Sequence, residues 1–218
     1  GIGENFLASD QMALRQVTDR FIYLEEGDLV MITPSSLQIY DIEDRVVDRE
    51  QTRIDEALES VDKGRFDHFM IKEIYEQPQA LAATFAAGAN HVVHDEAFGE
   101  GAAAVFDQVQ NVQIVACGTS FHAGMVARYW LEELAGVACE VEVASEFRYR
   151  KRVQHQGTLL VAISQSGETA DTLAALRNAT QGEFVGSLVI SNVDNSSLVR
   201  ECDLVFLSRA GAEIGVAS

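Results

Sequence analysis

Residues 1–57 alternate between short apolar runs and polar turns, which is typical of an antiparallel sheet. The apolar runs occupy 21–24, 29–32, 37–42 and 45–47. A sheet of this kind needs a second layer over its apolar face. These residues contain too little helix for that layer, and the first residue is Gly1 rather than Met. We therefore expect the chain to be an internal piece of a larger protein.

Residues 66–88 repeat apolar side chains at the spacing of an amphipathic helix. Because Pro78 has no backbone N–H, the pattern predicts one helix that ends at Gln77 and a second that begins at Pro78. Gly88 is the expected end of the second helix. A further short helix is predicted near 102–109, in a stretch rich in Ala and Gly.

Beyond residue 110, apolar strands alternate with amphipathic helices. Strands are predicted at 112–116, 139–144, 158–163, 185–190 and 204–207, and helices at 121–135, from 145 onward and at 170–180. Strands that are apolar throughout are buried on both faces, as in parallel sheets between two helical layers. The sequence therefore predicts an α/β fold, a three-layer α/β/α domain with a mostly parallel sheet of about five strands.

Composition and charge exclude several classes of function. Of the 218 residues, 47% are apolar, which excludes a disordered chain, and no apolar run reaches the ~18 residues of a membrane helix. With 16 Lys and Arg against 34 Asp and Glu, the net charge of −18 argues against nucleic acid or a membrane surface as a partner. Three scattered cysteines without a C-x-x-C spacing indicate a reduced, cytoplasmic protein.

The strongest candidate for chemistry is the polar loop Ser164–Thr169, between a predicted strand and a predicted helix. Ligands of open parallel sheets bind beyond the carboxyl ends of the strands, where a phosphate meets the free N–H groups of the next helix. Gly167 allows close approach of the backbone, and the hydroxyls at 164, 166 and 169 are neutral donors. The same residues suit an ordinary turn that caps a helix, and their spacing alone does not separate the two interpretations.

Two further loops fall at the same predicted edge. Cys117-Gly118-Thr119-Ser120 follows the first strand of the α/β region, and Gly211–Ser218 follows the last. Cys117 is more typical of a small buried residue than of a nucleophile, since no His–Asp arrangement lies near it in the sequence. The G-x-G-x-x-G pattern is absent, which disfavours a nucleotide-binding oxidoreductase.

The remaining polar clusters suggest less. His91 and His94 have no further ligands at metal spacing, so no metal site is expected. His122 is more typical of a helix face than of a catalytic base. The only basic cluster, Arg148–Arg152, is predicted to be a solvated face.

Six motifs in order along the chain resemble the glutamine–fructose-6-phosphate amidotransferase family. They are Gly3–Asp10, Lys72–Pro78, Cys117–Ser120, Ser145–Arg150, Ser164–Thr172 and Gly215–Ser218. The resemblance implies an enzyme that takes ammonia from glutamine and delivers it to fructose 6-phosphate, giving glucosamine 6-phosphate and glutamate. It implies a homodimer and no cofactor.

The resemblance also assigns domains. Residues 1–57 would be the C-terminal part of an N-terminal-nucleophile glutaminase domain. Residues 58–104 would be a linker with the opening helices of the isomerase half. Residues 105–218 would be the first sugar-isomerase (SIS) domain, truncated at its C-terminal end.

Site residues follow from the same resemblance. The sugar-phosphate pocket of the family corresponds here to Thr119, Ser120, Ser164, Gln165, Ser166, Thr169, Val216, Ala217 and Ser218. The family's nucleophilic cysteine would precede Gly1, and its isomerase lysine, glutamate and histidine would follow Ser218. No catalytic residue is therefore expected in this chain, which by itself should be inactive.

A second class of function stays open. A non-catalytic regulatory module of the same fold would also bind a sugar phosphate, and the fold alone does not separate a sensor from an enzyme. The glutaminase-like segment 1–57 favours the enzyme, because a sensor would have no use for it.

Overall fold

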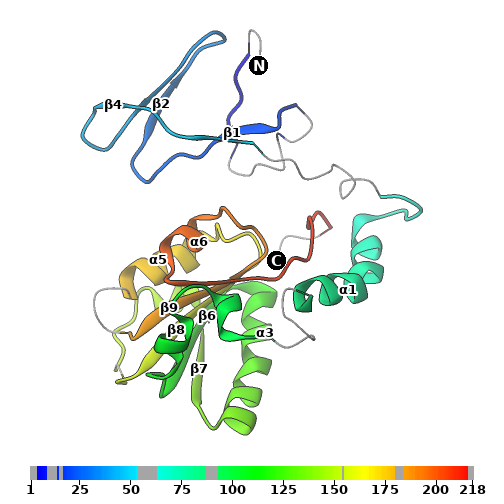
Figure 1. Cartoon of the computed structure of the whole chain (residues 1–218), viewed down its shortest axis with the longest axis vertical. Coiled ribbons are helices and arrows are strands. Elements are labelled where there is room, and N and C mark those ends of the chain that lie inside the picture. Colours follow the sequence, from blue (N-terminus) through cyan, green and yellow to red (C-terminus); the bar gives the residue numbers. More distant parts are fainter. Residues whose placement is uncertain are drawn as a thin grey trace. The chain divides into compact units, whose positions relative to one another are not determined.

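The computed structural model describes residues 4–8, 14, 17–53, 63–86, 93–153, 155–179 and 184–215. The chain divides into two compact units, Gly1–Asp62 and Lys63–Ser218, each of which has its own β-structure (Figure 1). None of the helices in the described part of the chain combines the length and the apolar character that a membrane span requires.

The N-terminal unit contains antiparallel strands, as the alternating pattern predicts. β2 (Leu29–Ile32), β3 (Leu37–Tyr40) and β4 (Val46–Val47) form a meander, and β1 (Arg20–Ile22) pairs with β5 (Gln51–Arg53). The β1–β5 pair was not predicted, because local patterning does not report which distant strands meet. An ion pair supports the meander. The Arg49 guanidinium donates to both carboxylate oxygens of Asp28, at 3.0 and 2.8 Å, and lowers the pKa of that carboxyl.

The C-terminal unit contains a five-stranded parallel sheet in the order β10-β9-β8-β6-β7. Its strands are β6 (Asn111–Ala116), β7 (Ala138–Val143), β8 (Thr158–Ser164), β9 (Gly186–Ser191) and β10 (Leu204–Leu207). The predicted parallel sheet is thus confirmed. The chain runs from β6 to β7 at one edge, and then returns to β8 on the other side of β6.

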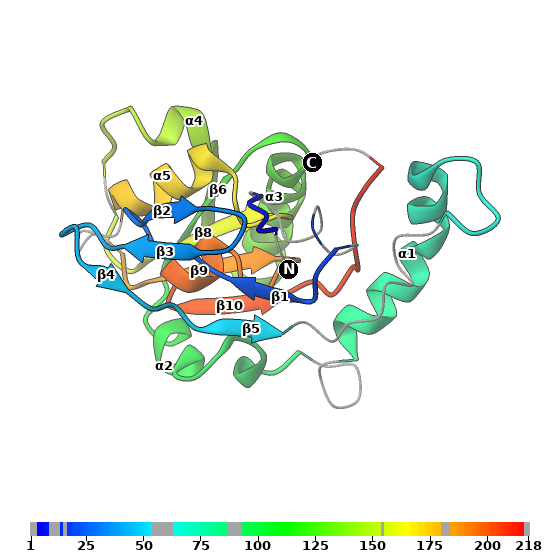
Figure 2. The same cartoon turned by 90° about the horizontal axis from the view of Figure 1, so that it is seen from above.

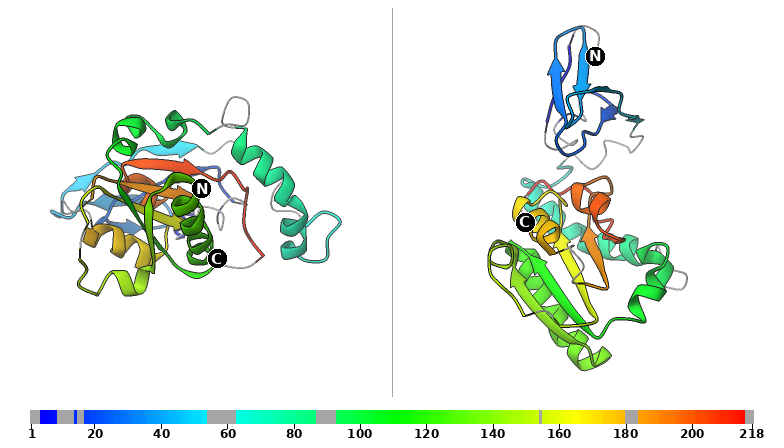
Figure 3. Two further views of the ribbon diagram at one scale, coloured as in Figure 1. Left: turned by 90° about the horizontal axis from the view of Figure 1, so that it is seen from below. Right: turned by 90° about the vertical axis from the view of Figure 1, so that its left-hand side faces the viewer.

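Helices cover both faces of this sheet (Figure 3). One face packs against α4 (Ala144–Phe147), α5 (Ala170–Ala179) and α6 (Ser197–Glu201), and the other against η4 (Asp95–Phe98), α2 (Ala102–Phe106) and α3 (Gly118–Trp130) with its π-helical continuation η5 (Leu131–Ala135). Neighbouring residues of one strand, such as Leu159 and Leu160, belong to different cores. Because side chains alternate across a sheet, both faces need apolar residues, which explains the continuously apolar strands.

Helix α1 (Phe69–Phe85) corrects one prediction, since it runs through Pro78 as a single helix. Proline in a helix interior removes one hydrogen bond and crowds the preceding turn. Here Pro78 is exposed, and the helix is fixed to the C-terminal segment on both sides of the proline, because Glu73 accepts the Ile214 N–H and the Thr84 hydroxyl donates to the Ser208 carbonyl. Gly88, the expected end of the second helix, lies outside the described residues.

We predict an alkaline loss of stability that depends on Cys202. Burial raises the pKa of this thiol from 9.0 to about 12, and that of Cys139 to about 11. The unfolded thiol ionises from about pH 9, whereas the folded thiol keeps its proton, so stability is full below pH 9 and falls as the pH rises towards 12. Between pH 8 and pH 10, Cys202 should account for a loss on the order of 1 kcal/mol.

Urea unfolding of wild type and Cys202→Ala at both pH values measures this contribution. The difference in unfolding free energy between the two proteins should shrink at pH 10. A difference that is independent of pH would contradict the burial of the thiol.

Candidate functional site

Two polar loops follow the neighbouring strands β6 and β8, where the order of strands along the chain reverses. β6 and β8 are parallel neighbours with Ala116 opposite Ile163, so the loops that follow them emerge side by side at one edge. The next strand after β6 lies on one side of this pair and the next strand after β8 lies on the other side, and α3 and α5 pack on opposite faces. A switch point of this kind leaves a crevice outside the carboxyl ends of the strands, where open α/β sheets bind ligands.

The loop Ser164–Thr169 gathers hydroxyls directly before α5. The hydroxyl oxygens of Ser164 and Thr169 lie 3.0 Å apart, and Ser164 Oγ also accepts the Gly167 N–H at 3.1 Å. Ser166 Oγ accepts the Glu168 N–H at 3.2 Å. The first N–H groups of a helix have no acceptor within the helix. The loop therefore presents hydroxyl and backbone donors at the positive end of the α5 dipole.

Helix α6 holds this loop from behind. The carbonyl of Gly167 accepts the Leu198 N–H at 3.1 Å, and a carboxylate oxygen of Glu168 accepts the Ser197 N–H at 2.7 Å. Gly167 has a φ of +66°, and a Cβ added to it would lie 2.0 Å from the hydroxyl oxygen of the buried Ser196. Only glycine fits this position, both for its backbone conformation and for the space available.

Asn192, directly after β9, is a site-supporting residue that the sequence analysis missed. Its N–H donates to the Gln165 carbonyl at 3.0 Å. Its side chain accepts the Ala210 N–H at 2.7 Å and donates to the Gly211 carbonyl at 2.5 Å. Asn192 thus joins the Ser164–Thr169 loop to the segment after β10. Its position at a strand end could have suggested such a role, because that edge carries the other loops as well.

The structure describes some of the other predicted site residues and leaves out the rest. Thr119 is exposed and Ser120 half-buried, both in the first turn of α3 beside the β8 loop. Val216, Ala217 and Ser218 lie outside the described residues. The structure therefore brings together the first two predicted loops and does not describe the binding residues of the third.

The basic cluster Arg148–Arg152 is partly exposed, as expected of a solvated face, and its arginines have partners. Arg148 contacts Asp171 in the first turn of α5 at 2.6 Å, and Arg150 contacts Glu142. The guanidinium of Arg152 lies 3.5 Å from the ring centroid of Phe147. The loops Cys117–Ser120 and Ser164–Thr169 contain no Lys or Arg of their own. An anion at this edge would depend on hydroxyl and backbone N–H donors.

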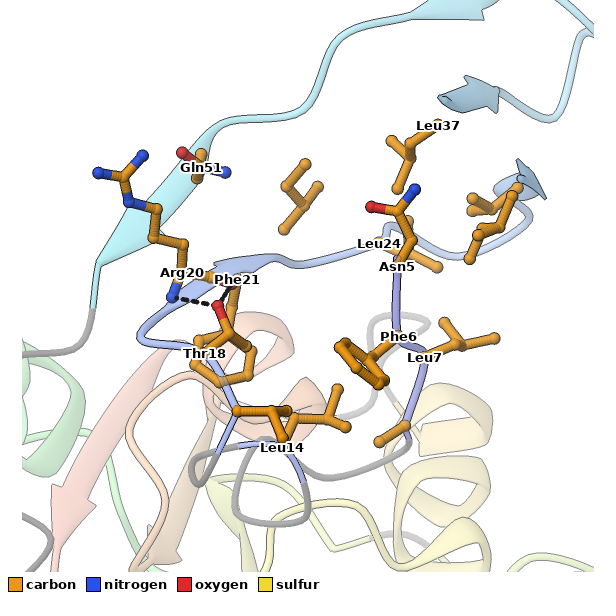
Figure 4. Close-up of a pocket in the computed structure, with 15 residues that line it drawn as sticks. Asn5, Phe6, Leu7, Leu14, Thr18, Arg20, Phe21, Leu24, Leu37 and Gln51 are labelled. Atoms are coloured by element: carbon orange, nitrogen blue, oxygen red, sulfur yellow. Dashed lines mark hydrogen bonds between the residues drawn. The ribbon is translucent and has the colours of Figure 1, made fainter. Parts of the chain in front are cut away.

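The N-terminal unit contains a separate, mostly apolar hollow of about 420 Å³ (Figure 4). Among its described lining residues, only Arg20 is ionisable. Asn5 has a structural role, because its side-chain amide donates to the Thr33 carbonyl at 2.7 Å. In the described parts of the chain, no three His, Cys, Asp or Glu side chains gather as metal ligands would. This hollow lacks the converging polar groups of a catalytic site.

Comparison with known proteins first defines the class. The family model described as SIS domain matches residues 106–218. The chain belongs to this SIS domain family.

More specific relatives match the whole chain. It is 62% identical over its full length to a glutamine–fructose-6-phosphate aminotransferase (isomerizing) of Pseudomonas syringae pv. tomato, and equally to one of Pseudomonas putida. The chain spans 36% of the length of each of these curated relatives. The C-terminal domain of glucosamine-fructose-6-phosphate aminotransferase from Francisella tularensis is a structural neighbour, with 52% identity and a TM-score of 0.70 over 72% of this chain and 44% of that one. The resemblance seen in the motifs is confirmed.

We predict that Gly167→Ala damages the protein more than Gly136→Ala. Both glycines have left-handed backbones, at φ +66° and +65°, but a Cβ on Gly136 would meet nothing within 4 Å. Gly136→Ala should therefore cost only the conformational strain, about 1–2 kcal/mol. Gly167→Ala adds the overlap with Ser196 and should cost about 2–5 kcal/mol. Urea unfolding of both variants measures the difference. Equal losses would show that α6 does not press on the loop.

Proposed function

We propose that this chain is the sugar-phosphate-binding part of a glutamine–fructose-6-phosphate aminotransferase. The whole protein would take ammonia from glutamine and deliver it to fructose 6-phosphate, giving glucosamine 6-phosphate and glutamate. The observation that carries the proposal is the pair of hydroxyl-bearing loops at the β6–β8 switch point. The identity of the relatives over the whole chain supports the choice of reaction.

Each loop has a distinct task in this proposal. The loop Ser164–Thr169 binds the phosphate, because its hydroxyls and the first N–H groups of α5 are suited to an oxyanion. Thr119 and Ser120 bind sugar hydroxyls from the first turn of α3, and Val216, Ala217 and Ser218 contribute to the same pocket. The reacting groups of both half-reactions would come from outside this chain, so its own residues bind and orient the substrate.

The domain boundaries belong to the same proposal. Residues 1–57 would end a glutaminase domain, 58–104 would link it to the isomerase half, and 105–218 would form most of the first SIS domain. The apolar hollow of the N-terminal unit supports the first assignment, since other parts of a glutaminase domain would cover such a surface.

We also propose a cytoplasmic homodimer. The three cysteines are free thiols, as in a reducing compartment. Five large apolar side chains lie exposed along α3 and η5, namely Met125, Val126, Tyr129, Trp130 and Leu134. Their spacing places them on neighbouring helix positions, and such patches mark surfaces that another protein covers.

We predict that replacing the hydroxyls of Ser164, Ser166 and Thr169 together by alanine weakens the binding of fructose 6-phosphate at least ~100-fold. Each hydrogen bond to a charged phosphate contributes ~1.5–3 kcal/mol. Thr119→Ala should have a smaller effect, because it removes a neutral contact to the sugar. Calorimetric titration of the full-length protein measures both.

Ser197→Ala is the control, since this hydroxyl accepts from Arg200 on α6 rather than facing the loop. Unchanged affinity in the triple variant would refute the phosphate assignment and favour an ordinary capped turn. Binding by the wild-type protein without formation of glucosamine 6-phosphate would favour the regulatory module.

For the homodimer, we predict that Trp130→Glu in the full-length protein weakens self-association by at least about 2 kcal/mol, since a buried Trp is a typical interface anchor. Sedimentation at several concentrations measures the effect. Glu133→Lys, on the same helical segment, is the control for the effect of a changed charge alone. A dimer that withstands Trp130→Glu would place the interface elsewhere.

A further inference from the structure

A glutamate of helix α1 holds the backbone of the last described residues. One carboxylate oxygen of Glu73 accepts the N–H of Ile214 at 2.7 Å and that of Gly215 at 2.9 Å. The two partners are separated from Glu73 by 141 and 142 residues. Figure 2 shows the C-terminal segment, in red, running towards α1. Glu73 is half-buried, so both bonds are partly shielded from water.

The approach of this segment to α1 is very close at Gly215. A Cβ added there would lie 2.5 Å from the second carboxylate oxygen of Glu73 and 2.8 Å from the Cα of Met70. The clash with Met70 involves backbone, which does not move aside as a flexible side chain would. Glycine is therefore required by space, and the contact fixes where the chain passes.

The same segment is held at its other end. The Thr84 hydroxyl, also on α1, donates to the Ser208 carbonyl, and the Asn192 side chain binds Ala210 and Gly211. Asn192 itself is tied to Gln165 of the proposed phosphate loop. The segment 208–215 is thus fixed between α1 and the site edge of the sheet. The next residues along the chain are Val216, Ala217 and Ser218.

We propose that Glu73 is a positioning residue for the sugar-phosphate site, because it fixes the segment 208–215 that runs from the site edge of the sheet to α1. This inference rests on the proposed function. The role of Glu73 is to fix the peptide groups of Ile214 and Gly215. A carboxylate is suited to this task because one oxygen binds two N–H donors, and charged acceptors form the stronger hydrogen bonds. Without it, the segment 208–215 would lose its anchor on α1, and sugar-phosphate binding would be weaker by the cost of ordering that segment again.

The test is a titration of the full-length protein with fructose 6-phosphate. Glu73→Ala should weaken binding by about 10-fold or more, given the loss of two charge-assisted bonds. Glu73→Gln keeps an acceptor oxygen and should recover most of the affinity. Glu76→Ala is the matched control, because Glu76 lies one turn further along α1 and pairs only loosely with Lys72, at 3.6 Å. It should bind like wild type.

A positioning role also predicts a selective kinetic effect. In Glu73→Ala, KM for fructose 6-phosphate should rise while KM for glutamine stays within about twofold, which a general loss of folded protein would not produce. If the alanine variant fails to fold, Gly215→Ala replaces it, because its Cβ would displace the same segment from Glu73 and Met70 and should weaken sugar-phosphate binding to a similar extent.

The outcomes separate the two proposals. If the wild type binds fructose 6-phosphate and Glu73→Ala binds it equally well, the positioning role is wrong and the proposed function stands. Normal binding by Gly215→Ala would overturn the positioning role in the same way. If the wild type does not bind fructose 6-phosphate, the proposed function fails, and this inference fails with it.

Discussion

The parallel pairing of β6 with β8 is the constraint on which the rest of the C-terminal unit depends. β8 is buried along nearly its whole length, and both strands carry apolar residues on both faces. Helical layers are therefore needed on both sides. Because the chain leaves β6 for one edge and returns to its other side, α3 and α5 must lie on opposite faces. The crevice between their preceding loops is a direct consequence of this order of strands.

The acidity of the chain restricts which groups could hold an anion in this crevice. With a net charge of −18, a phosphate would be repelled unless local donors compensate. The arginines of the cluster 148–152 are engaged with acidic or aromatic partners, such as Arg148 with Asp171. What remains is a set of hydroxyls and N–H groups held in place by buried contacts between Gly167 and α6. Donors that are already ordered need little further ordering when a ligand binds.

The supporting contacts extend well beyond the loops. Asn192 connects the Ser164–Thr169 loop to the segment after β10, and Glu73 and Thr84 connect that segment to α1. These hydrogen bonds stabilise α1 as one helix through Pro78. They also explain how a helix without any buried residue is fixed in place.

The sequence by itself determined the local features: the apolar strands, the end of a helix at Gly136, and the polar loop Ser164–Thr169 at a strand end. These could be predicted because periodicity, glycine and turn residues act within a few positions of one another. Only the tertiary structure decided which strands pair, which hydroxyls meet, and that Asn192 and Glu73 hold the segment after β10. These features depend on contacts between residues that are far apart in the sequence, more than a hundred positions in the case of Glu73. The local sequence does not indicate such partners.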